Sequence, residues 1–161
     1  MAAFDDDLCA LERALGLDSR ACDGKDRKTD YAGLLSGAFE VARRASRPDL
    51  LGTNVADRAL VHQWLEYRLV HLSSASCRGG KRTMLQELNK HLADQVYMVG
   101  NYLTLADILL YFFLHPIMVE MTILEREELD CLTRWFDHIQ HQPGMRQHLP
   151  PVVIPRNKLY S

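Results

Sequence analysis

The sequence predicts an all-α fold, and three observations support this prediction. Apolar residues recur at helical spacing along most of the 161-residue chain. Among the first 50 residues only Thr29 and Val41 are β-branched, so no strand pattern is found there. A helix-capping motif from Thr104 to Asp107 precedes an almost wholly apolar stretch that ends at Leu114, which is typical of a buried helix. We therefore expect a bundle of helices arranged around one buried central helix.

The first expected helix carries Leu8, Leu11 and Leu15 at positions i, i+3 and i+7. The acidic residues 5–7 suit the positive end of its dipole, and Gly16 is placed to end it. The polar and charged stretch of residues 18–30 that follows is predicted to be a loop.

A second helix is expected to begin at Thr29 or Asp30, because either side chain can cap it. Pro48 is expected to close this helix, since proline cannot donate the hydrogen bond that would continue it. Its apolar residues are Leu34, Leu35, Ala38, Val41, Ala42 and Ala45.

Two further helices are expected before the central one. The first has Asn54 and Asp57 as a candidate capping box and apolar residues near helical spacing over residues 61–69. The second contains the leucine-rich residues 84–92. The small, glycine-containing residues 73–80 between them predict a short turn, so the two helices are expected to form an antiparallel pair.

The capping motif gives the central helix its start. Thr104 is predicted as the N-cap, with its hydroxyl accepting the backbone N–H of Asp107, while the Asp107 carboxylate reaches back to the N–H of Thr104. Leu103 and Ile108 are spaced as a hydrophobic staple. A cap of this kind contributes about 1–2 kcal/mol, which is the loss expected for Asp107→Ala. The helix is expected to bend or stop near Pro116.

The rest of the chain is expected to be helical until prolines accumulate. One helix is predicted over residues 124–139, and Pro143 is predicted to open a last short helix through Leu149. Helix formation in the tail is then stopped by Pro150, Pro151 and Pro155.

Composition and charge exclude several classes of protein. The chain is 47% hydrophobic and 25% charged, as expected of a soluble domain. Its formal net charge of −2 gives no general attraction to nucleic acid or to an anionic membrane. No apolar run reaches the roughly 18 residues of a membrane span. We therefore predict no membrane segment and no direct nucleic-acid binding.

No residue pattern indicates a catalytic, cofactor or metal site. His138 and His141 lie three residues apart without an acidic or cysteine partner at ligand spacing, which is typical of surface histidines. Gly79 and Gly80 lie outside a phosphate-loop frame. The four cysteines lie far apart without a C-x-x-C motif, which favours unpaired thiols in a cytosolic protein over a disulfide or a zinc site.

Four segments of the chain resemble one known family. They are Q-W-L-E-Y-R at residues 63–68, L-T-L-A-D-I-L-L-Y at 103–111, R-W-F-D-H-I-Q-H-Q-P-G-M-R-Q-H-L at 134–149 and V-V-I-P-R-N-K-L-Y at 152–160. In this order they resemble the small glutathione-transferase-like auxiliary subunits of the animal multi-aminoacyl-tRNA synthetase complex.

The resemblance implies two regions. Residues 1–50 would be a reduced, thioredoxin-like N-terminal region, and residues 51–161 a helical domain like the C-terminal half of glutathione transferases. Family members carry a short I-P-V-L-like strand between their first two helices, and the chain between Leu17 and Tyr31 has none. A glutathione site also needs a cis-proline, and no proline precedes Pro48. The prediction is a protein that is not an enzyme and needs no cofactor.

The resemblance also implies a scaffold that bridges synthetases. One face would bind the transferase-like domain of methionyl-tRNA synthetase and another that of glutamyl-prolyl-tRNA synthetase. The second face would use Arg134 and Trp135 of one helix and Met145 and Arg146 of the following turn. Arg146 matches the family's arginine that faces a partner aspartate, and a planar guanidinium can bind a carboxylate through two hydrogen bonds. A cytoplasmic and also nuclear location is implied in the same way.

Two other functions remain open from the sequence. One is a divergent glutathione-dependent transferase, which binding to a glutathione resin would distinguish from a scaffold. The other is a free regulatory or RNA-associated module, which salt-dependent tRNA binding would support.

Overall fold

The computed structural model describes residues 3–17, 31–74, 78–147 and 149–154. Within these ranges the chain forms seven α-helices and one 3-10 helix, and no strand occurs in them. The elements are α1 (Ala3–Ala14), α2 (Tyr31–Arg44), η2 (Pro48–Leu51), α3 (Val55–Ser74), α4 (Arg78–His91), α5 (Leu105–Glu120), α6 (Ile123–Glu128) and α7 (Asp130–Gln140).

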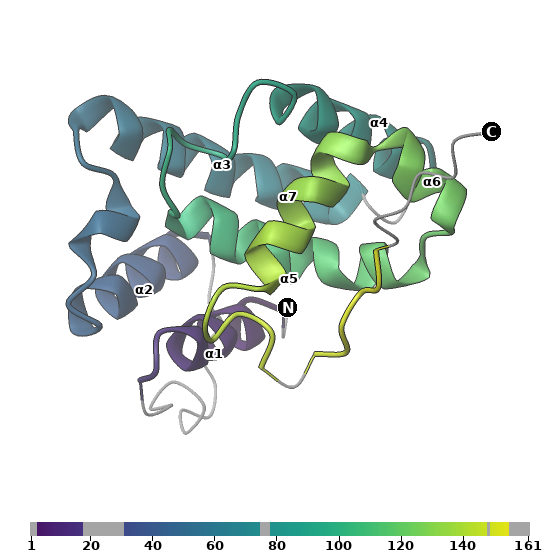
Figure 1. The fold of residues 1–161 in the computed structure, drawn as a ribbon. Helices are drawn as coiled ribbons and strands as arrows, with labels where there is room; N and C mark the ends of the chain where they lie inside the picture. The colour runs from purple at the N-terminus through teal and green to yellow at the C-terminus, as the bar shows by residue number, and fades with distance from the viewer. Residues whose placement is uncertain (1–2, 18–30, 75–77, 148, 155–161) are drawn as a thin grey trace.

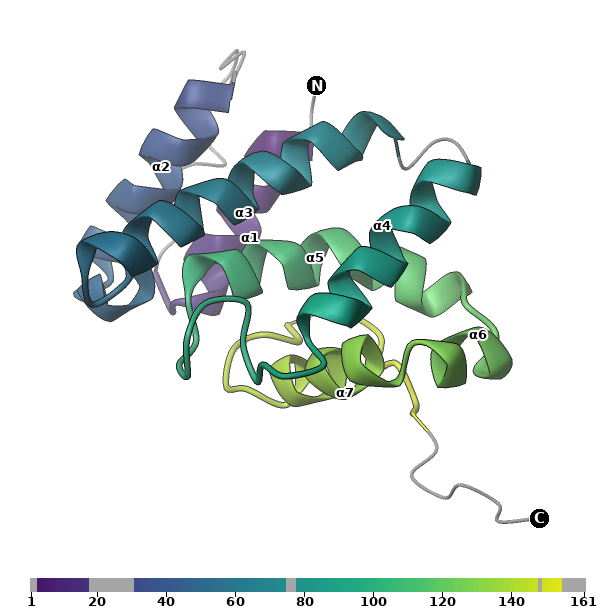
Figure 2. The same cartoon turned by 90° about the horizontal axis from the view of Figure 1, so that it is seen from above.

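Helix α5 lies at the centre of the bundle (Figures 1 and 2). It packs against α1, α3 and α7, and most of its side chains from Leu105 to Met118 are buried. Because these residues are apolar on every side of the helix, each face requires a neighbouring helix to cover it. The prediction of one buried central helix is confirmed.

The described residues before and after position 50 share one hydrophobic core. Leu11 of α1 and Leu34 of α2 belong to the same cluster of buried side chains as Leu109 of α5 and Trp135 of α7. The division into residues 1–50 and 51–161 stays a prediction. Because both parts share this core, packing against α1 and α2 helps to hold the helices after position 50 in place.

Helix α1 ends at the predicted place. Gly16 adopts a positive φ of 69°, and the N–H of Leu17 donates to the carbonyl of Glu12 at 2.9 Å. This is the left-handed termination that glycine favours. The predicted loop of residues 18–30 and the predicted cap at Thr29 or Asp30 lie outside the described residues.

Helix α2 ends earlier than predicted. It stops at Arg44, and Ser46 adopts a left-handed φ of 55°. The N–H of Arg47 donates to the carbonyl of Ala42 at 3.0 Å, which completes the helix end without a proline. Pro48 instead begins η2, where its fixed φ suits a first helical position.

The pair of helices before the centre is present, with two corrections. Asn54 caps α3 by accepting the N–H of Asp57 at 2.8 Å, but the Asp57 carboxylate is bound by Thr53 and Tyr102 rather than by the backbone of Asn54. The predicted turn is also shorter than residues 73–80, since α4 already begins at Arg78.

Helix α5 continues through Pro116 to Glu120, so of the two outcomes predicted near Pro116, a bend or a stop, the stop is wrong. Proline removes one backbone hydrogen bond, but Leu114 before it and Ile117 and Met118 after it are all buried. Burial of apolar side chains on both sides of the proline outweighs the lost bond.

The single helix predicted over residues 124–139 is two helices. The chain breaks at Leu129, whose φ and ψ are −115° and 46°, and the carbonyl of Arg126 accepts bonds from Leu129 N–H and Thr133 Oγ1. The short helix predicted after Pro143 is also wrong, because the described residues after α7 form turns. The break at Leu129 reflects a side chain, that of Thr133, binding a backbone carbonyl that a continuous helix would use.

The cysteine prediction is partly wrong. Cys9 of α1 is disulfide-bonded, whereas Cys131 of α7 is a free and partly exposed thiol. Cys22 and Cys77 lie outside the described residues. A disulfide depends on the distance between two cysteines in space, and sequence spacing does not report that distance.

None of the described helices combines the length and the apolar character needed to cross a lipid bilayer.

Candidate functional site

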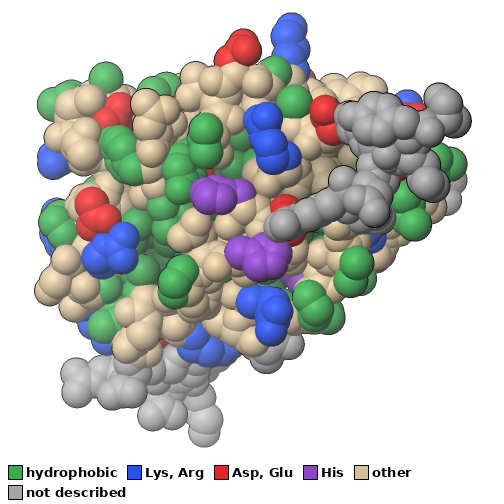
Figure 3. All heavy atoms as spheres, viewed as in Figure 1, with side chains coloured by type: hydrophobic (Ala, Val, Ile, Leu, Met, Phe, Trp, Pro, Cys, Tyr) green, Lys and Arg blue, Asp and Glu red, His purple; other side chains and the backbone are tan. Residues whose placement is uncertain are grey.

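The candidate site is the outer side of α7 together with the turn and the extended segment that follow it. The helix is strongly amphipathic, because its buried side chains recur at helical spacing. Exposed side chains are Asp130, Arg134 and His138 on the helix and His141 directly after it. Figure 3, drawn from the side on which α7 crosses the bundle, shows histidines near the middle of this face with basic side chains beside them.

The Asp107 carboxylate lies beneath this face and joins three segments. Its Oδ1 accepts the N–H of Met98 at 2.8 Å and Nε1–H of Trp135 at 3.0 Å. Its Oδ2 accepts the N–H of Thr104 at 3.0 Å and the Thr104 hydroxyl at 2.8 Å. Burial raises the pKa of Asp107, while these hydrogen bonds act in the opposite direction.

The predicted cap residues lie where the sequence placed them. Thr104 and Asp107 form a capping box at the start of α5. Ile108 is fully buried, and Leu103 is half-buried against the core, as a hydrophobic staple requires. The additional bonds from Met98 and Trp135 show that Asp107 also fixes α7 and the segment before α5.

Arg146 is exposed on the turn after α7. The turn includes Gly144, whose φ is 81°, and Met145, whose side chain is 2% exposed. Among the described residues no carboxylate lies within ion-pair distance of the Arg146 guanidinium. Its charge still reaches the core: burial raises the pKa of Tyr111 to about 12, and Arg146 acts to lower it.

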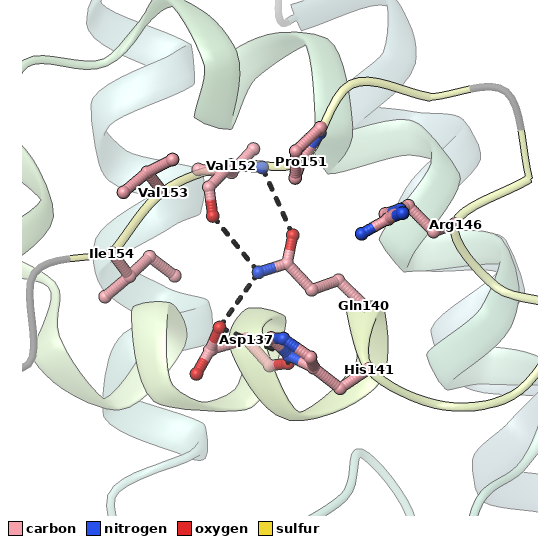
Figure 4. A pocket seen from close by; sticks show the side chains of 8 residues that line it. All are labelled: Asp137, Gln140, His141, Arg146, Pro151, Val152, Val153 and Ile154. Carbon is pink, nitrogen blue, oxygen red and sulfur yellow. Dashed lines mark hydrogen bonds and ion pairs between the residues drawn. The ribbon is translucent and has the colours of Figure 1, made fainter.

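A hollow of about 320 Å³ lies beside Arg146 (Figure 4). Asp137 and Gln140 of α7 and His141 directly after it form one wall, and residues 151–154 form an apolar wall opposite them. His141 Nδ1 lies 3.4 Å from Asp137 Oδ1. The hollow therefore places a cation, a carboxylate and an apolar surface side by side.

Gln140 holds the apolar wall in place. Its Nε2 donates to the carbonyl of Val152 at 3.1 Å and to Asp137 Oδ1 at 2.8 Å, while its Oε1 accepts the N–H of Val152 at 3.2 Å (Figure 4). His115 Nε2 lies 2.9 Å from the carbonyl of Pro150, and Arg126 Nη1 donates to that of Val153 at 3.0 Å. Three helices thus hold one extended segment through its backbone.

Sequence reasoning missed these three side chains. Gln140 offers one signal, since it lies four residues after Phe136 on the apolar stripe of α7 and is buried. A buried amide requires hydrogen-bond partners. For His115 and Arg126 the sequence carries no signal, because their partners are backbone carbonyls from a distant segment.

Two of the four predicted partner-binding residues need correction. Trp135 and Met145 are 1% and 2% exposed, so their side chains belong to the core and not to the accessible face. Their burial follows from their size and apolar character. Arg134 is exposed as expected, but its Nη2 donates to the carbonyl of Leu92 at 2.8 Å, at the end of α4. Of the four predicted partner-binding residues, Arg146 is therefore the one whose charged group is exposed and has no ion-pair partner among the described residues.

The two histidines interpreted from the sequence as surface histidines have polar contacts within the protein. His138 Nε2 lies 2.9 Å from the Tyr97 hydroxyl, and His141 Nδ1 lies 2.7 Å from the carbonyl of Asp137. Within the described ranges no group of three histidine, cysteine or acidic residues is arranged to hold a metal ion. The arrangement is suited to recognising a protein surface that carries a carboxylate.

The chain is similar in sequence to several known proteins. A family model described as "Nuclear-export cofactor Arc1p" matches residues 57–143. The chain is 39% identical to human eukaryotic translation elongation factor 1 epsilon-1 over 166 aligned residues, which cover 96% of this chain and 95% of that protein. It is 34% identical over 107 residues to the bifunctional glutamate/proline–tRNA ligase of Cricetulus griseus, which covers 66% of this chain and 7% of the ligase.

A third relative concerns the fold. The chain is 24% identical over 140 residues to glutathione S-transferase F9 of Arabidopsis thaliana, which covers 70% of this chain and 64% of that protein. Together with the wholly helical character of the described residues, this match confirms the predicted all-α fold of the glutathione-transferase C-terminal type.

Proposed function

The chain belongs to the eukaryotic translation elongation factor 1 epsilon-1 family, and on this premise we propose that it is a non-catalytic auxiliary subunit of an aminoacyl-tRNA synthetase assembly in translation. The similarity to part of a glutamate/proline–tRNA ligase and to a protein named as a tRNA-aminoacylation cofactor supports a partner of this class.

The observation that carries the proposal is the state of Arg146. Its guanidinium is exposed beside a hollow and has no ion-pair partner among the described residues. An arginine held in this way is available to bind a carboxylate of another protein. The apolar residues 151–154 beside it provide a surface that loses water on docking.

We propose that the partner on this face is the region of the glutamate/proline–tRNA ligase that resembles the chain itself. Two domains of one fold can pair through equivalent surfaces by an approximate twofold axis. The family resemblance implies that methionyl-tRNA synthetase binds a different face. We include this second partner in the proposal.

Arg146→Ala tests the assignment. It should weaken binding of the ligase region by roughly 2–4 kcal/mol, because truncating one member of a desolvated charge pair leaves the other buried and unpaired. Binding of the methionyl-tRNA synthetase domain and the melting temperature should stay near the parent values. The measurement is a pair of calorimetric titrations with the two purified domains.

Arg82→Ala is the matched control. Arg82 is also an exposed arginine, and its side chain is 72% accessible, but it lies on α4 and pairs with Glu128 at 3.5 Å. We expect it to leave both titrations unchanged. Equal weakening of both partners by Arg146→Ala, or of neither, would refute the assignment of Arg146 to one face.

The proposal also predicts no glutathione chemistry. No proline precedes Pro48, and Tyr31 is the first residue of helix α2 rather than part of a strand. The purified protein should therefore neither bind immobilised glutathione nor conjugate it to an electrophile in a spectrophotometric assay. Turnover above background that Tyr31→Phe abolishes would overturn the non-catalytic function.

A further inference from the structure

We propose that helix α1 positions Arg146, so that the N-terminal region controls carboxylate binding on the face described above. The inference rests on the proposed function and concerns how the arginine is held. Its evidence is the contact between α1 and the turn that carries Arg146.

Gly144 packs directly against the end of α1. A Cβ at this position would lie 2.5 Å from the carbonyl oxygen of Ala14. The oxygen belongs to the backbone of a packed helix, so it cannot rotate away as the end of a flexible side chain can. The φ of Gly144, 81°, is also one that favours glycine. Only glycine lets the turn approach α1 this closely.

Gln147 forms the second contact with α1. Its Nε2 donates to the carbonyl of Ala10 at 2.7 Å. Its φ is 46°, in the left-handed region that residues other than glycine seldom adopt. Such a conformation persists only where surrounding contacts hold it, and the bond to α1 is the contact that the side chain makes.

These contacts flank Arg146 on both sides. Gly144 and Gln147 rest on α1, and between them the Met145 side chain enters the core. The Arg146 side chain, which lines the hollow beside α7 (Figure 4), is thus positioned by residues that are themselves fixed. Helix α1 is in turn joined to α3 by the buried pair of Asp7 and Arg68. A displacement of α1 therefore changes the position of Arg146, and by linkage a partner on Arg146 stabilises the docked α1.

Gly144→Ala is the test, and Gly100→Ala is the matched control. Gly100 has a similar φ of 63°, but a Cβ there would lie 3.5 Å from the nearest atom of Tyr102, an ordinary contact. Both variants share the cost of a left-handed alanine, and only Gly144→Ala displaces the turn from α1. We expect Gly144→Ala to weaken binding of the ligase region about tenfold, the scale of one charge-assisted hydrogen bond. Gly100→Ala should leave it near the parent value.

A double-mutant cycle separates positioning from a general loss of structure. If Gly144 acts through Arg146, Gly144→Ala should cause no further loss of binding in an Arg146→Ala background. Gln147→Gly supplies a second variant, because glycine readily adopts the left-handed backbone and the substitution removes the side chain that bonds to Ala10. It should also weaken binding in the parent and not in the Arg146→Ala protein.

Amide hydrogen exchange measures the stability of the turn around Arg146 in the free protein, with no binding partner present. The N–H of Leu149 donates to the carbonyl of Arg146 at 2.8 Å, and that of Met145 to Gln142 at 3.2 Å. Their protection should fall in Gly144→Ala and Gln147→Gly but not in Gly100→Ala. Unchanged exchange, or a further loss of binding in the Arg146→Ala background, would overturn the role of α1. A third outcome separates the two proposals. If exchange becomes faster in Gly144→Ala and Gln147→Gly but Arg146→Ala still binds the ligase region normally, then α1 does hold the turn, and it is the proposed function that is overturned.

Discussion

Asp107→Asn should destabilise the protein by roughly 3–5 kcal/mol, because hydrogen bonds to a charged group contribute about 1.5–3 kcal/mol each and the substitution weakens or removes at least two of them. An asparagine presents one oxygen and one NH2 group, whereas the Asp107 carboxylate accepts four hydrogen bonds through two oxygens. In one orientation the NH2 group of the amide faces the N–H donors of Met98 and Trp135; in the other it faces the N–H of Thr104, so at least one buried N–H loses its acceptor in either case. Buried donors without an acceptor cost about 1–3 kcal/mol each.

The expected loss exceeds the 1–2 kcal/mol of an ordinary helix cap. The difference arises because Met98 and Trp135 also depend on this carboxylate. Thermal and denaturant unfolding of Asp107→Asn and Asp107→Ala would measure it. Asp94→Asn, at an exposed position in the turn after α4, is the control. A melting curve of Asp107→Asn that matches the control would show that these hydrogen bonds contribute little.

Asp7→Ala should cost a similar amount, roughly 3–5 kcal/mol, because it leaves a buried guanidinium without its carboxylate. The Arg68 side chain is 2% exposed and donates from α3 to Asp7 on α1. Its guanidinium carbon also lies 5.5 Å from the centre of the Phe113 ring of α5. The pair therefore joins three helices, with the Arg68 guanidinium almost wholly buried.

Asp6→Ala is the control for this pair, since Asp6 is the exposed neighbour of Asp7 on the same helix. We expect it to change the melting temperature little. The combined variant Asp7→Leu and Arg68→Met should be more stable than Asp7→Ala, because replacing both members of a buried pair by apolar residues avoids the unpaired charge. If the combined variant is less stable than Asp7→Ala, the loss comes from packing and not from the charge.

Patterns within short segments predicted much of the fold. The spacing of leucines and the position of Gly16 located α1 and its end. The capping motif located the start of α5 at Leu105, after the Thr104 cap. These predictions succeeded because the interactions that decide them join residues a few positions apart, so the sequence itself displays both partners.

The same reasoning failed where a distant segment decided the outcome. Pro116 does not end α5, because helices on either side of it bury the residues around it. Trp135 and Met145 lie in the core although the resemblance placed them on the partner face. Which side of a helix or turn becomes buried depends on segments far away in the sequence, so the neighbouring residues do not predict it.

For the candidate site, the sequence alone determined that Arg146 follows a proline–glycine turn after a helix, and the resemblance gave it a role. Only the tertiary structure placed Gly144 against Ala14, bonded Gln147 to Ala10, and brought residues 151–154 to Gln140. Each of these contacts pairs a side chain or a glycine with a backbone group. A backbone carbonyl or N–H is the same in every residue, so the sequence contains no mark of which one will be used, and only the packing of the helices selects it.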